Sequence, residues 1–296
     1  MRRFVQPPDD AVARNESEPI VVHGASENRS DQLVLFVHGL HGDRYETWGQ
    51  FPHLLYHHTR CDVGLYGYAS GYQRATQLSA TFDKQSEELA HQLRDCDYRQ
   101  ITLIGHSMGG LMCMGAIRNL IDAGSKLAIR RISSLVLVGV PQAGSVRVPF
   151  WATWISSDLR LMRAHSRTLD EIQRRFIDHV VVSPIEQSFG TRFVIPTFAI
   201  VGTKDRWVTD LSATLRIPSD QVRRIVGTHT AISKPADADS EAFKFTRSRI
   251  QDATNFHEKR TRAQTKVQQQ LSNLIAENFT GSDQVIASGI IRFGQP

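Results

Sequence analysis

The sequence predicts an α/β fold in which helices cover both faces of a mostly parallel sheet. Three observations support this prediction. Short apolar runs rich in Val, Ile and Leu recur along the chain, helical patterns lie between them, and 296 residues with 41% hydrophobic content can bury a large core. Continuous apolar runs of this length are typical of strands that are buried on both faces. Their alternation with helices predicts parallel pairing.

The predicted strands follow a polar, proline-containing leader and are bounded by Gly, Pro or charged residues. They cover Ile20–Val22, Leu33–Val37, Val63–Tyr68, Ile101–Ile104, Leu135–Val140, Thr197–Val201 and Val222–Val226. The predicted helices between them cover Trp48–His57, Thr76–Arg94, Met108–Ala123 and a segment that follows Pro149. A charged, amphipathic helical pattern runs from Asp237 to Asn278 and predicts a final helix.

We expect a flexible leader over residues 1–17, one folded domain over residues 18–280 and a C-terminal tail over residues 281–296. The domain contains an insertion, at about residues 141–195, where the alternation of strands and helices stops. Five apolar residues in this insertion follow helical spacing: Trp151, Trp154, Ile155, Leu159 and Met162. Such a stripe fits either a helix packed on the sheet or a helical cap over a binding site. In a cap, Trp151 and Trp154 would bind substrate.

Composition argues against several functional classes. The three cysteines are widely spaced and form no CxxC pair, so free thiols are expected. The first 20 residues lack the apolar core of a secretory signal, and no window is apolar enough to span a membrane, so we expect a cytoplasmic location. The net charge of +5 is not concentrated in a Lys/Arg run, which favours a diffusely charged surface over nucleic-acid binding.

Metal and nucleotide binding also lack support in the sequence. His53, His57 and His58 include one pair spaced by four residues, but no H-E-x-x-H glutamate or nearby third ligand accompanies them. Neither a G-x-x-x-x-G-K-[ST] loop nor a G-x-G-x-x-G loop occurs. We therefore expect no metal and no cofactor.

The segment Gly105–Gly109 reads GHSMG and matches the G-x-S-x-G pattern. A predicted strand ends at Ile104 and a predicted helix begins at Met108, so Ser107 lies at a sharp strand-to-helix turn. Glycines around the serine allow the neighbouring backbone to approach closely. The turn would project the Ser107 hydroxyl above the sheet edge, near the free N–H groups of the helix N-terminus. This setting predicts a nucleophilic serine.

A nucleophilic serine needs a base and an orienting acid, and this motif predicts the chain order Ser, Asp or Glu, His. Asp205 follows one predicted strand and His229 follows the next. Loops at the carboxyl ends of parallel strands meet at one edge of a sheet, so we expect Ser107, Asp205 and His229 to converge. Asp210 is the alternative acid, but it lies farther from the strand end.

Three other histidines fit the role of the base less well. His179 precedes both candidate acids in the chain, and His257 lies in the charged C-terminal helix. His106 is adjacent to the serine, which should direct its side chain away from Ser107.

The residues His38-Gly39-Leu40 form a predicted turn directly after the strand that ends at Val37. Backbone N–H groups in this turn can face the space above the serine. We predict that the N–H groups of Leu40 and Met108 form an oxyanion hole. An ordinary tight turn is the alternative interpretation.

Together these motifs make the chain resemble the α/β-hydrolases of the lipase and esterase type over about residues 18–235. Four segments are similar to the GPI-inositol-deacylase-like and serine-active-site-containing esterases: FVHGLHGDRYETW, GLYGYAS, LIGHSMGGLM and GTHTAISKP. Residues 141–144 read PQAG where that branch commonly has P-H-x-G. This difference concerns the pocket and leaves the three predicted catalytic residues unchanged.

The motif and the resemblance together imply a serine hydrolase that cleaves carboxylic esters, of lipid or acyl-chain character, through an acyl-enzyme. Ser107 would attack, His229 would transfer the proton and Asp205 would fix the imidazole tautomer. The same residues could also cleave thioesters or amides, and a non-catalytic interaction protein is a further alternative. The expected partner is a small-molecule or lipid ester, with peripheral membrane association as an option and no nucleic acid. The sequence does not specify an oligomeric state.

Overall fold

The computed structural model describes residues 11–14, 20–25, 30–40, 42–68, 82–144, 167–182 and 192–278. The chain divides into two compact units, residues 1–251 and 252–296. In the described part of the chain, the first unit contains all the strands, and the second consists of the distal part of helix α10 (Glu241–Asn278).

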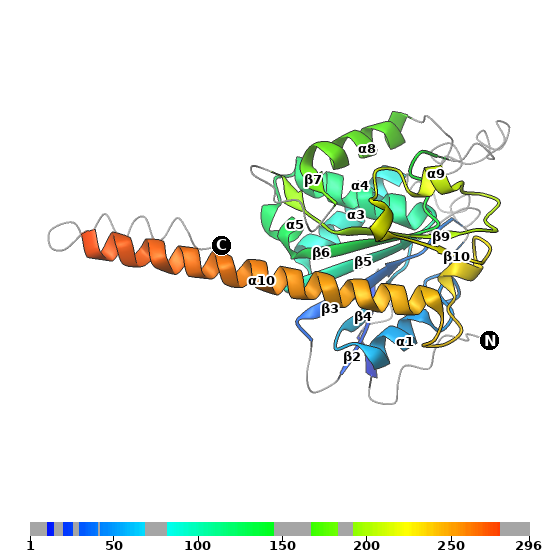
Figure 1. The fold of residues 1–296 in the computed structure, drawn as a ribbon, viewed down its shortest axis with the longest axis horizontal. Helices are drawn as coiled ribbons and strands as arrows, with labels where there is room; N and C mark the ends of the chain where they lie inside the picture. Colours follow the sequence, from blue (N-terminus) through cyan, green and yellow to red (C-terminus); the bar gives the residue numbers. More distant parts are fainter. Residues whose placement is uncertain are drawn as a thin grey trace. The chain divides into compact units, whose positions relative to one another are not determined.

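Eight strands of the described residues form one sheet, in the order β1-β2-β4-β3-β5-β6-β9-β10 (Figure 1). Along the chain these strands are β1 (Ala11–Arg14), β2 (Ile20–Ala25), β3 (Gln32–Val37), β4 (Asp62–Tyr66), β5 (Gln100–His106), β6 (Ile132–Val138), β9 (Thr197–Gly202) and β10 (Val222–Ile225). The pairs β1/β2 and β2/β4 are antiparallel, and the pairs from β4 through to β10 are parallel. The predicted mostly parallel sheet is confirmed. Two short strands, β7 (Val180–Val181) and β8 (Phe193–Val194), form a separate parallel pair.

Successive side chains of the central strands enter two different apolar cores. In β6, Leu135 and Leu137 belong to the first core, whereas Val136 and Val138 belong to the second. Because both faces of the strand are buried, both sets must be apolar, which explains the continuous apolar runs in the sequence.

Helices cover both of these cores, as predicted (Figure 1). The first core is covered by α3 (Phe82–Asp95), α4 (Met108–Asp122), α5 (Lys126–Arg131) and α8 (Arg167–His179). The second is covered by α1 (Phe51–His58), the turn η2 (Ala231–Ser233) and the first part of α10. Helix α4 is buried on almost every side, which fits its nearly uncharged sequence.

Two predicted boundaries differ from the structure for local reasons. Helix α1 begins at Phe51 and not at Trp48, because Gly49 has a positive φ of 55° and Pro52 suits only the first helical turn. Strand β6 begins at Ile132, three residues earlier than predicted. Its buried Ser133 and Ser134 hydroxyls can continue the strand because both lie within hydrogen-bonding distance of the Thr102 hydroxyl, at 3.2 and 3.0 Å.

Several predictions fall partly or wholly outside the described residues. Within the insertion at 141–195, α8 packs Leu169, Ile172 and Phe176 against the first core. The five residues of the predicted cap stripe, Trp151, Trp154, Ile155, Leu159 and Met162, lie outside the described residues. Residues 76–81 of the predicted helix Thr76–Arg94 also lie outside them.

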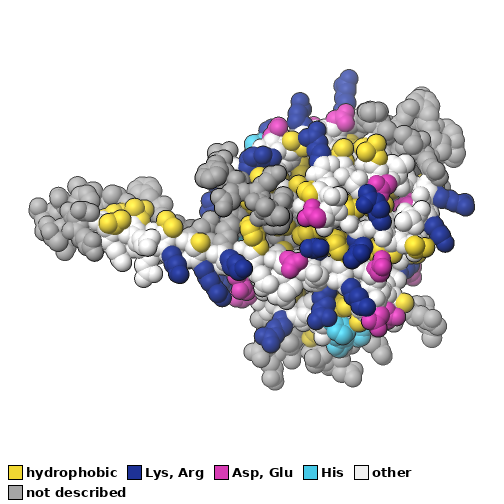
Figure 2. Space-filling view, viewed as in Figure 1, with side chains coloured by type: hydrophobic (Ala, Val, Ile, Leu, Met, Phe, Trp, Pro, Cys, Tyr) yellow, Lys and Arg dark blue, Asp and Glu magenta, His cyan; other side chains and the backbone are white. Residues whose placement is uncertain are grey.

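Charges of both signs are interspersed on the surface of the described residues. Figure 2 shows Lys and Arg side chains spaced over the visible face, with Asp and Glu side chains between them. Among the described helices, none has the length and apolar character needed to cross a membrane. All three cysteines are free thiols, as predicted, and burial raises the pKa of Cys61 and Cys113.

Candidate active site

The predicted site residues come from loops at the carboxyl ends of four parallel strands in the same sheet. The turn at residues 38–40 follows β3, Ser107 follows β5, Asp205 follows β9 and His229 follows β10. Because these strands run in the same direction, their carboxyl ends share one edge of the sheet.

Ser107 occupies a strained backbone conformation between β5 and α4, with φ 53° and ψ −125°. A non-glycine residue with positive φ costs about 1–3 kcal/mol, which the surrounding structure must offset. The Ser107 N–H donates to the Val138 carbonyl at 2.9 Å, and the Gly110 N–H donates to the Ser107 carbonyl at 3.1 Å. Together these bonds fix the turn, in which Ser107 is largely buried, with 9% of the residue exposed.

Gly109 explains why this turn requires glycine beside the serine. A Cβ atom at this position would overlap the carbonyl oxygens of Val37 and His38. Both oxygens belong to backbone at the end of β3, which cannot move without disturbing the sheet. The absence of a side chain therefore allows the N-terminus of α4 to contact the turn at residues 38–40.

Hydrogen bonds hold the turn at residues 38–40 in a conformation that leaves the Leu40 N–H available to a ligand. The Gly39 carbonyl accepts hydrogen bonds from the Gly42 N–H at 3.0 Å and from His38 Nδ1 at 2.9 Å. Since the peptide unit is planar and trans, fixing this carbonyl also fixes the Leu40 N–H in the opposite direction. Within the described residues, neither the Leu40 N–H nor the Met108 N–H has a hydrogen-bond acceptor. A Cβ atom on Gly39 would lie 2.9 Å from Ser107 Cβ, so the turn adjoins the serine.

The side chains of His38 and Tyr68 stabilise this turn. Their rings stack 4.2 Å apart, and the Tyr68 hydroxyl donates to the His38 carbonyl at 2.6 Å. His38 Nδ1 must carry a proton to bond the Gly39 carbonyl, whereas Nε2 accepts from the Tyr68 N–H at 3.4 Å. Burial lowers the pKa of His38, which keeps the ring in this neutral form.

Asp205 and His229 form a buried hydrogen-bonded pair. Asp205 Oδ2 lies 2.7 Å from His229 Nδ1, and the two side chains are 1% and 15% exposed. The other carboxylate oxygen accepts from the N–H groups of Trp207 and Val208 at 2.8 and 3.0 Å. Burial alone would raise the pKa of Asp205, but its hydrogen bond and charge interaction with His229 and the two amides outweigh burial and lower it.

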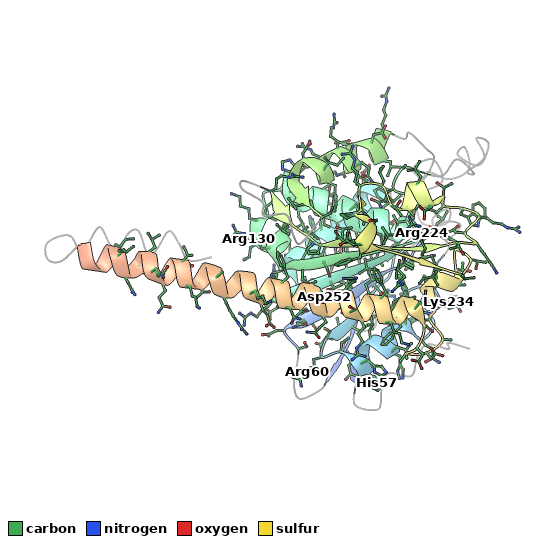
Figure 3. The ribbon with its side chains drawn as sticks, viewed as in Figure 1. His57, Arg60, Arg130, Arg224, Lys234 and Asp252 are labelled. Atoms are coloured by element: carbon green, nitrogen blue, oxygen red, sulfur yellow. The ribbon has the colours of Figure 1, made fainter. Side chains whose placement is uncertain are left out.

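The rival acid, Asp210, has a different partner. It accepts two hydrogen bonds from Arg224, at 2.6 and 2.9 Å, and both side chains are half-exposed. Arg224 extends from β10 and is labelled in Figure 3. Asp205, and not Asp210, therefore contacts His229.

The end of β6 connects the serine to the histidine. Val138 accepts the Ser107 N–H, and the next residue, Gly139, lies under the His229 ring. A Cβ atom on Gly139 would be 3.3 Å from His229 Nδ1. The Ser107 hydroxyl forms no hydrogen bond with any residue that the structure describes.

Comparison with known proteins shows the family to which the chain belongs. Residues 34–238 match the model of the alpha/beta hydrolase family, which is more than half of the chain. The chain belongs to the α/β hydrolase family. Comparison with curated protein sequences gives no match.

Solved structures similar to this α/β hydrolase include three lipases. Mature Bacillus licheniformis lipase BlEst2 has a TM-score of 0.51 and 16% identity, over 72% of this chain and 92% of that one. Aspergillus fumigatus lipase B has a TM-score of 0.52 and 15% identity, over 72% of this chain and 52% of that one. Paleococcus ferrophilus monoacylglycerol lipase has a TM-score of 0.50 and 13% identity, over 81% and 98%. At these identities the likeness concerns the fold.

Sequence reasoning missed His106 as a contributor to the site. Its side chain is buried, and Nε2 lies 3.0 Å from the His229 carbonyl oxygen. Adjacency to Ser107 in the sequence argues only against His106 as the base. The brace formed by His38 and Tyr68 was missed as well, although both residues lie in segments that support the family resemblance.

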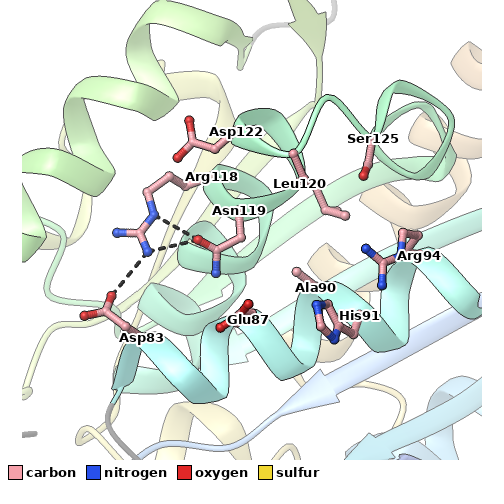
Figure 4. A pocket seen from close by; sticks show the side chains of 11 residues that line it. Asp83, Glu87, Ala90, His91, Arg94, Arg118, Asn119, Leu120, Asp122 and Ser125 are labelled. Carbon is pink, nitrogen blue, oxygen red and sulfur yellow. Dashed lines mark hydrogen bonds and ion pairs between the residues drawn. The ribbon is translucent and has the colours of Figure 1, made fainter.

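One cavity of this α/β hydrolase lies away from these loops. It has a volume of about 320 Å³ and is lined by α3, the second half of α4 and Ser125 (Figure 4). Within it, Arg118 donates to Asp83 at 3.2 Å and to Asn119. In the described ranges, no three His, Cys, Asp or Glu side chains are grouped to hold a metal ion.

Proposed function

We propose that this α/β hydrolase is a serine esterase that cleaves carboxylic esters of lipid or acyl-chain character. The observation that carries the proposal is the 2.7 Å bond between Asp205 and His229, on loops beside the strained turn at Ser107. A buried carboxylate that fixes one imidazole nitrogen leaves the other free to accept a proton. Hydrolysis by an acyl-enzyme needs this arrangement and a nucleophile.

In the proposed acylation step, His229 Nε2 removes the proton from Ser107 as the serine oxygen attacks the ester carbonyl. The negative charge that develops on the carbonyl oxygen is stabilised by the N–H groups of Leu40 and Met108. One such donor typically contributes about 2.7–4 kcal/mol to the transition state. The tetrahedral intermediate collapses, the alcohol leaves with the proton from His229, and the acyl group remains on Ser107.

Deacylation repeats the same steps with water in place of the serine. His229 takes a proton from water, which attacks the acyl-enzyme, and the same two N–H groups stabilise the second oxyanion. Collapse of this intermediate releases the carboxylic acid, and His229 returns the proton to Ser107. Asp205 remains ionised throughout, which agrees with its lowered pKa.

Two features support an apolar acyl group as the substrate, and the proposed cap would bind it. Leu40 packs against the first apolar core, and Met108 is fully buried, so the proposed oxyanion site adjoins apolar surface. The three similar solved structures described above are lipases. In the proposed cap, Trp151 and Trp154 would cover the acyl chain.

Peripheral contact with a lipid surface is part of the same proposal. Trp207 and Leu211 follow Asp205 in the chain and are 57% and 77% exposed. Exposed tryptophan suits a membrane interface, because its ring combines apolar area with a polar N–H.

The proposal is tested with a series of p-nitrophenyl esters of rising acyl length, together with matched thioesters and anilides. We expect ester hydrolysis that increases with chain length in the wild type and falls by about 10³ to 10⁶ in kcat in Ser107→Ala. Faster cleavage of thioesters or anilides would reassign the substrate class. Equal rates for the wild type and Ser107→Ala with every substrate would reject the enzymatic role.

A further inference from the structure

His106 lies between the serine turn and the loop that carries His229. It is the last residue of β5 and directly precedes Ser107, but its side chain extends to the other loop. The His106 and His229 rings are 4.8 Å apart, and His106 Nε2 lies 3.0 Å from the His229 backbone carbonyl. On its other side, the Trp48 ring meets it edge-on at 6.1 Å.

The chemistry of this contact fixes the protonation of His106. A carbonyl oxygen only accepts hydrogen bonds, so His106 Nε2 must carry the hydrogen. Burial is the largest cause that lowers the pKa of His106 to about 3, and its charge interaction with His229 acts in the same direction, whereas its hydrogen bond to the His229 carbonyl acts in the opposite one. Asp205 acts in the opposite direction, and His38 adds to the lowering. At neutral pH the ring is uncharged, and its single N–H is committed to His229.

Hydrogen bonds restrain the loop around His229 on both sides of the histidine, but among the described backbone groups none donates to the His229 carbonyl itself. The Thr228 carbonyl accepts from the N–H groups of Ala231 and Ile232, and the Gly227 carbonyl accepts from Lys204. The His229 carbonyl has no backbone donor within the described residues, and the His106 side chain is the group that reaches it. His106 therefore supplies the hydrogen bond that restrains the main chain at His229 itself.

We infer that His106 is a positioning residue that sets the backbone of His229 relative to Ser107 through one buried N–H···O=C hydrogen bond. Asp205 fixes the rotation of the imidazole, while His106 fixes the main chain from which the imidazole extends. His106 and Ser107 are consecutive residues at the end of β5. The end of this strand therefore positions both the nucleophile, Ser107, and the main chain of the base, His229. The inference rests on the proposed function, since it concerns the base of that reaction.

The test compares two replacements that differ in one property. His106→Gln retains an N–H at roughly the same distance from Cα, whereas His106→Leu fills similar space without a donor. For each variant we would measure kcat and KM with a soluble short-chain ester, the pH profile of kcat/KM, and the proton NMR signal of His229 Nδ1–H. His106→Leu should lower kcat by about 10- to 100-fold, because small misplacements of a catalytic group have effects of this size. KM should change by less than about threefold.

The hydrogen bond from His106 to the His229 carbonyl also predicts how the two variants differ. In His106→Leu the His229 signal should shift or broaden, and the acid limb of the pH profile should move. His106→Gln should restore kcat to within about threefold of the wild type, with the original His229 signal. If His106→Leu fails to fold, His106→Asn replaces it, because its shorter amide cannot reach the carbonyl.

Two results would overturn the inference. One is wild-type kcat and an unchanged His229 signal in His106→Leu. The other is a His106→Gln enzyme as impaired as the leucine variant, which would show that the N–H donor is irrelevant. Failure of the proposed function gives a different result, because the wild type would then hydrolyse no ester. The NMR signal of His229 would still change in His106→Leu, since the hydrogen bond between the two residues does not depend on catalysis, and it would not change in Ser107→Ala.

Discussion

Replacement of Asp205 by asparagine changes one oxygen of a carboxylate that accepts three hydrogen bonds. The amide oxygen of the new side chain can still accept from the N–H groups of Trp207 and Val208, so the loop should keep its shape. The amide nitrogen would face His229 Nδ1 and donate to it, which forces the hydrogen of the imidazole onto Nε2. That nitrogen could then no longer accept the Ser107 proton. The expected loss is on the order of 10⁴ in kcat, or about 5 kcal/mol of transition-state free energy.

Asp210→Asn is the matched control, because it is the same chemical change five residues downstream. Asp210 pairs with Arg224, and both side chains are about half-exposed. Exposed ion pairs contribute about 0.2–1 kcal/mol, so stability should fall slightly and kcat should stay within about twofold of the wild type. Initial rates with a short p-nitrophenyl ester and melting curves of both variants decide the outcome. A severe effect of Asp210→Asn, or more than a tenth of wild-type kcat in Asp205→Asn, would refute the assignment of the acid.

Three further predictions use other parts of the site. His106 has its pKa lowered to about 3, so it supplies stability fully above its ordinary pKa of 6.5 and loses it as pH falls toward 3. Urea unfolding at several pH values between about 3 and 6.5 should show that His106 makes the free energy of unfolding fall by up to about 1.4 kcal/mol for each pH unit of acidification. The same pH dependence in His106→Leu would contradict the prediction. Gly109→Ala should cost about 1–3 kcal/mol or more and impair activity, since its Cβ overlaps backbone at the end of β3. Gly124→Ala, where a Cβ meets open space at φ 64°, should cost about 1–2 kcal/mol and leave kcat unchanged. Replacing Trp151 and Trp154 together by alanine should lower kcat/KM for long-chain esters more than for acetate esters, and an unchanged chain-length profile with a large drop in melting temperature would place them in a core instead.

The central sheet was predictable from sequence because burial on both faces favours apolar side chains at most positions of its strands. The first two strands show the limit of this signal. β1 has the sequence AVAR in a polar leader and was not predicted, because it pairs with β2 without an apolar run of its own. The antiparallel direction of β2 was likewise not encoded in its own sequence, since it depends on β1 and β4.

The candidate site was predictable where chemistry constrains local sequence. The glycines beside Ser107 reflect a close backbone approach, and the acid and the base follow strands that the hydrophobic pattern identifies. The supporting contacts were not predictable in this way. His106 meets His229 across 123 residues of chain, and Tyr68 meets His38 across 30. A single sequence carries no local signal for such long-range pairs.

Labelling with a fluorophosphonate probe tests the central claim, that Ser107 is an activated nucleophile, most directly. The probe phosphonylates a serine hydroxyl whose proton is removed by an adjacent base, and this needs no knowledge of the substrate. The account predicts one adduct per chain, located by peptide mass spectrometry on the segment that contains Ser107, with parallel loss of ester hydrolysis. It also predicts no adduct in Ser107→Ala and labelling slowed by orders of magnitude in Asp205→Asn. Adduct on another residue, or equal labelling of the wild type and Ser107→Ala, would contradict it.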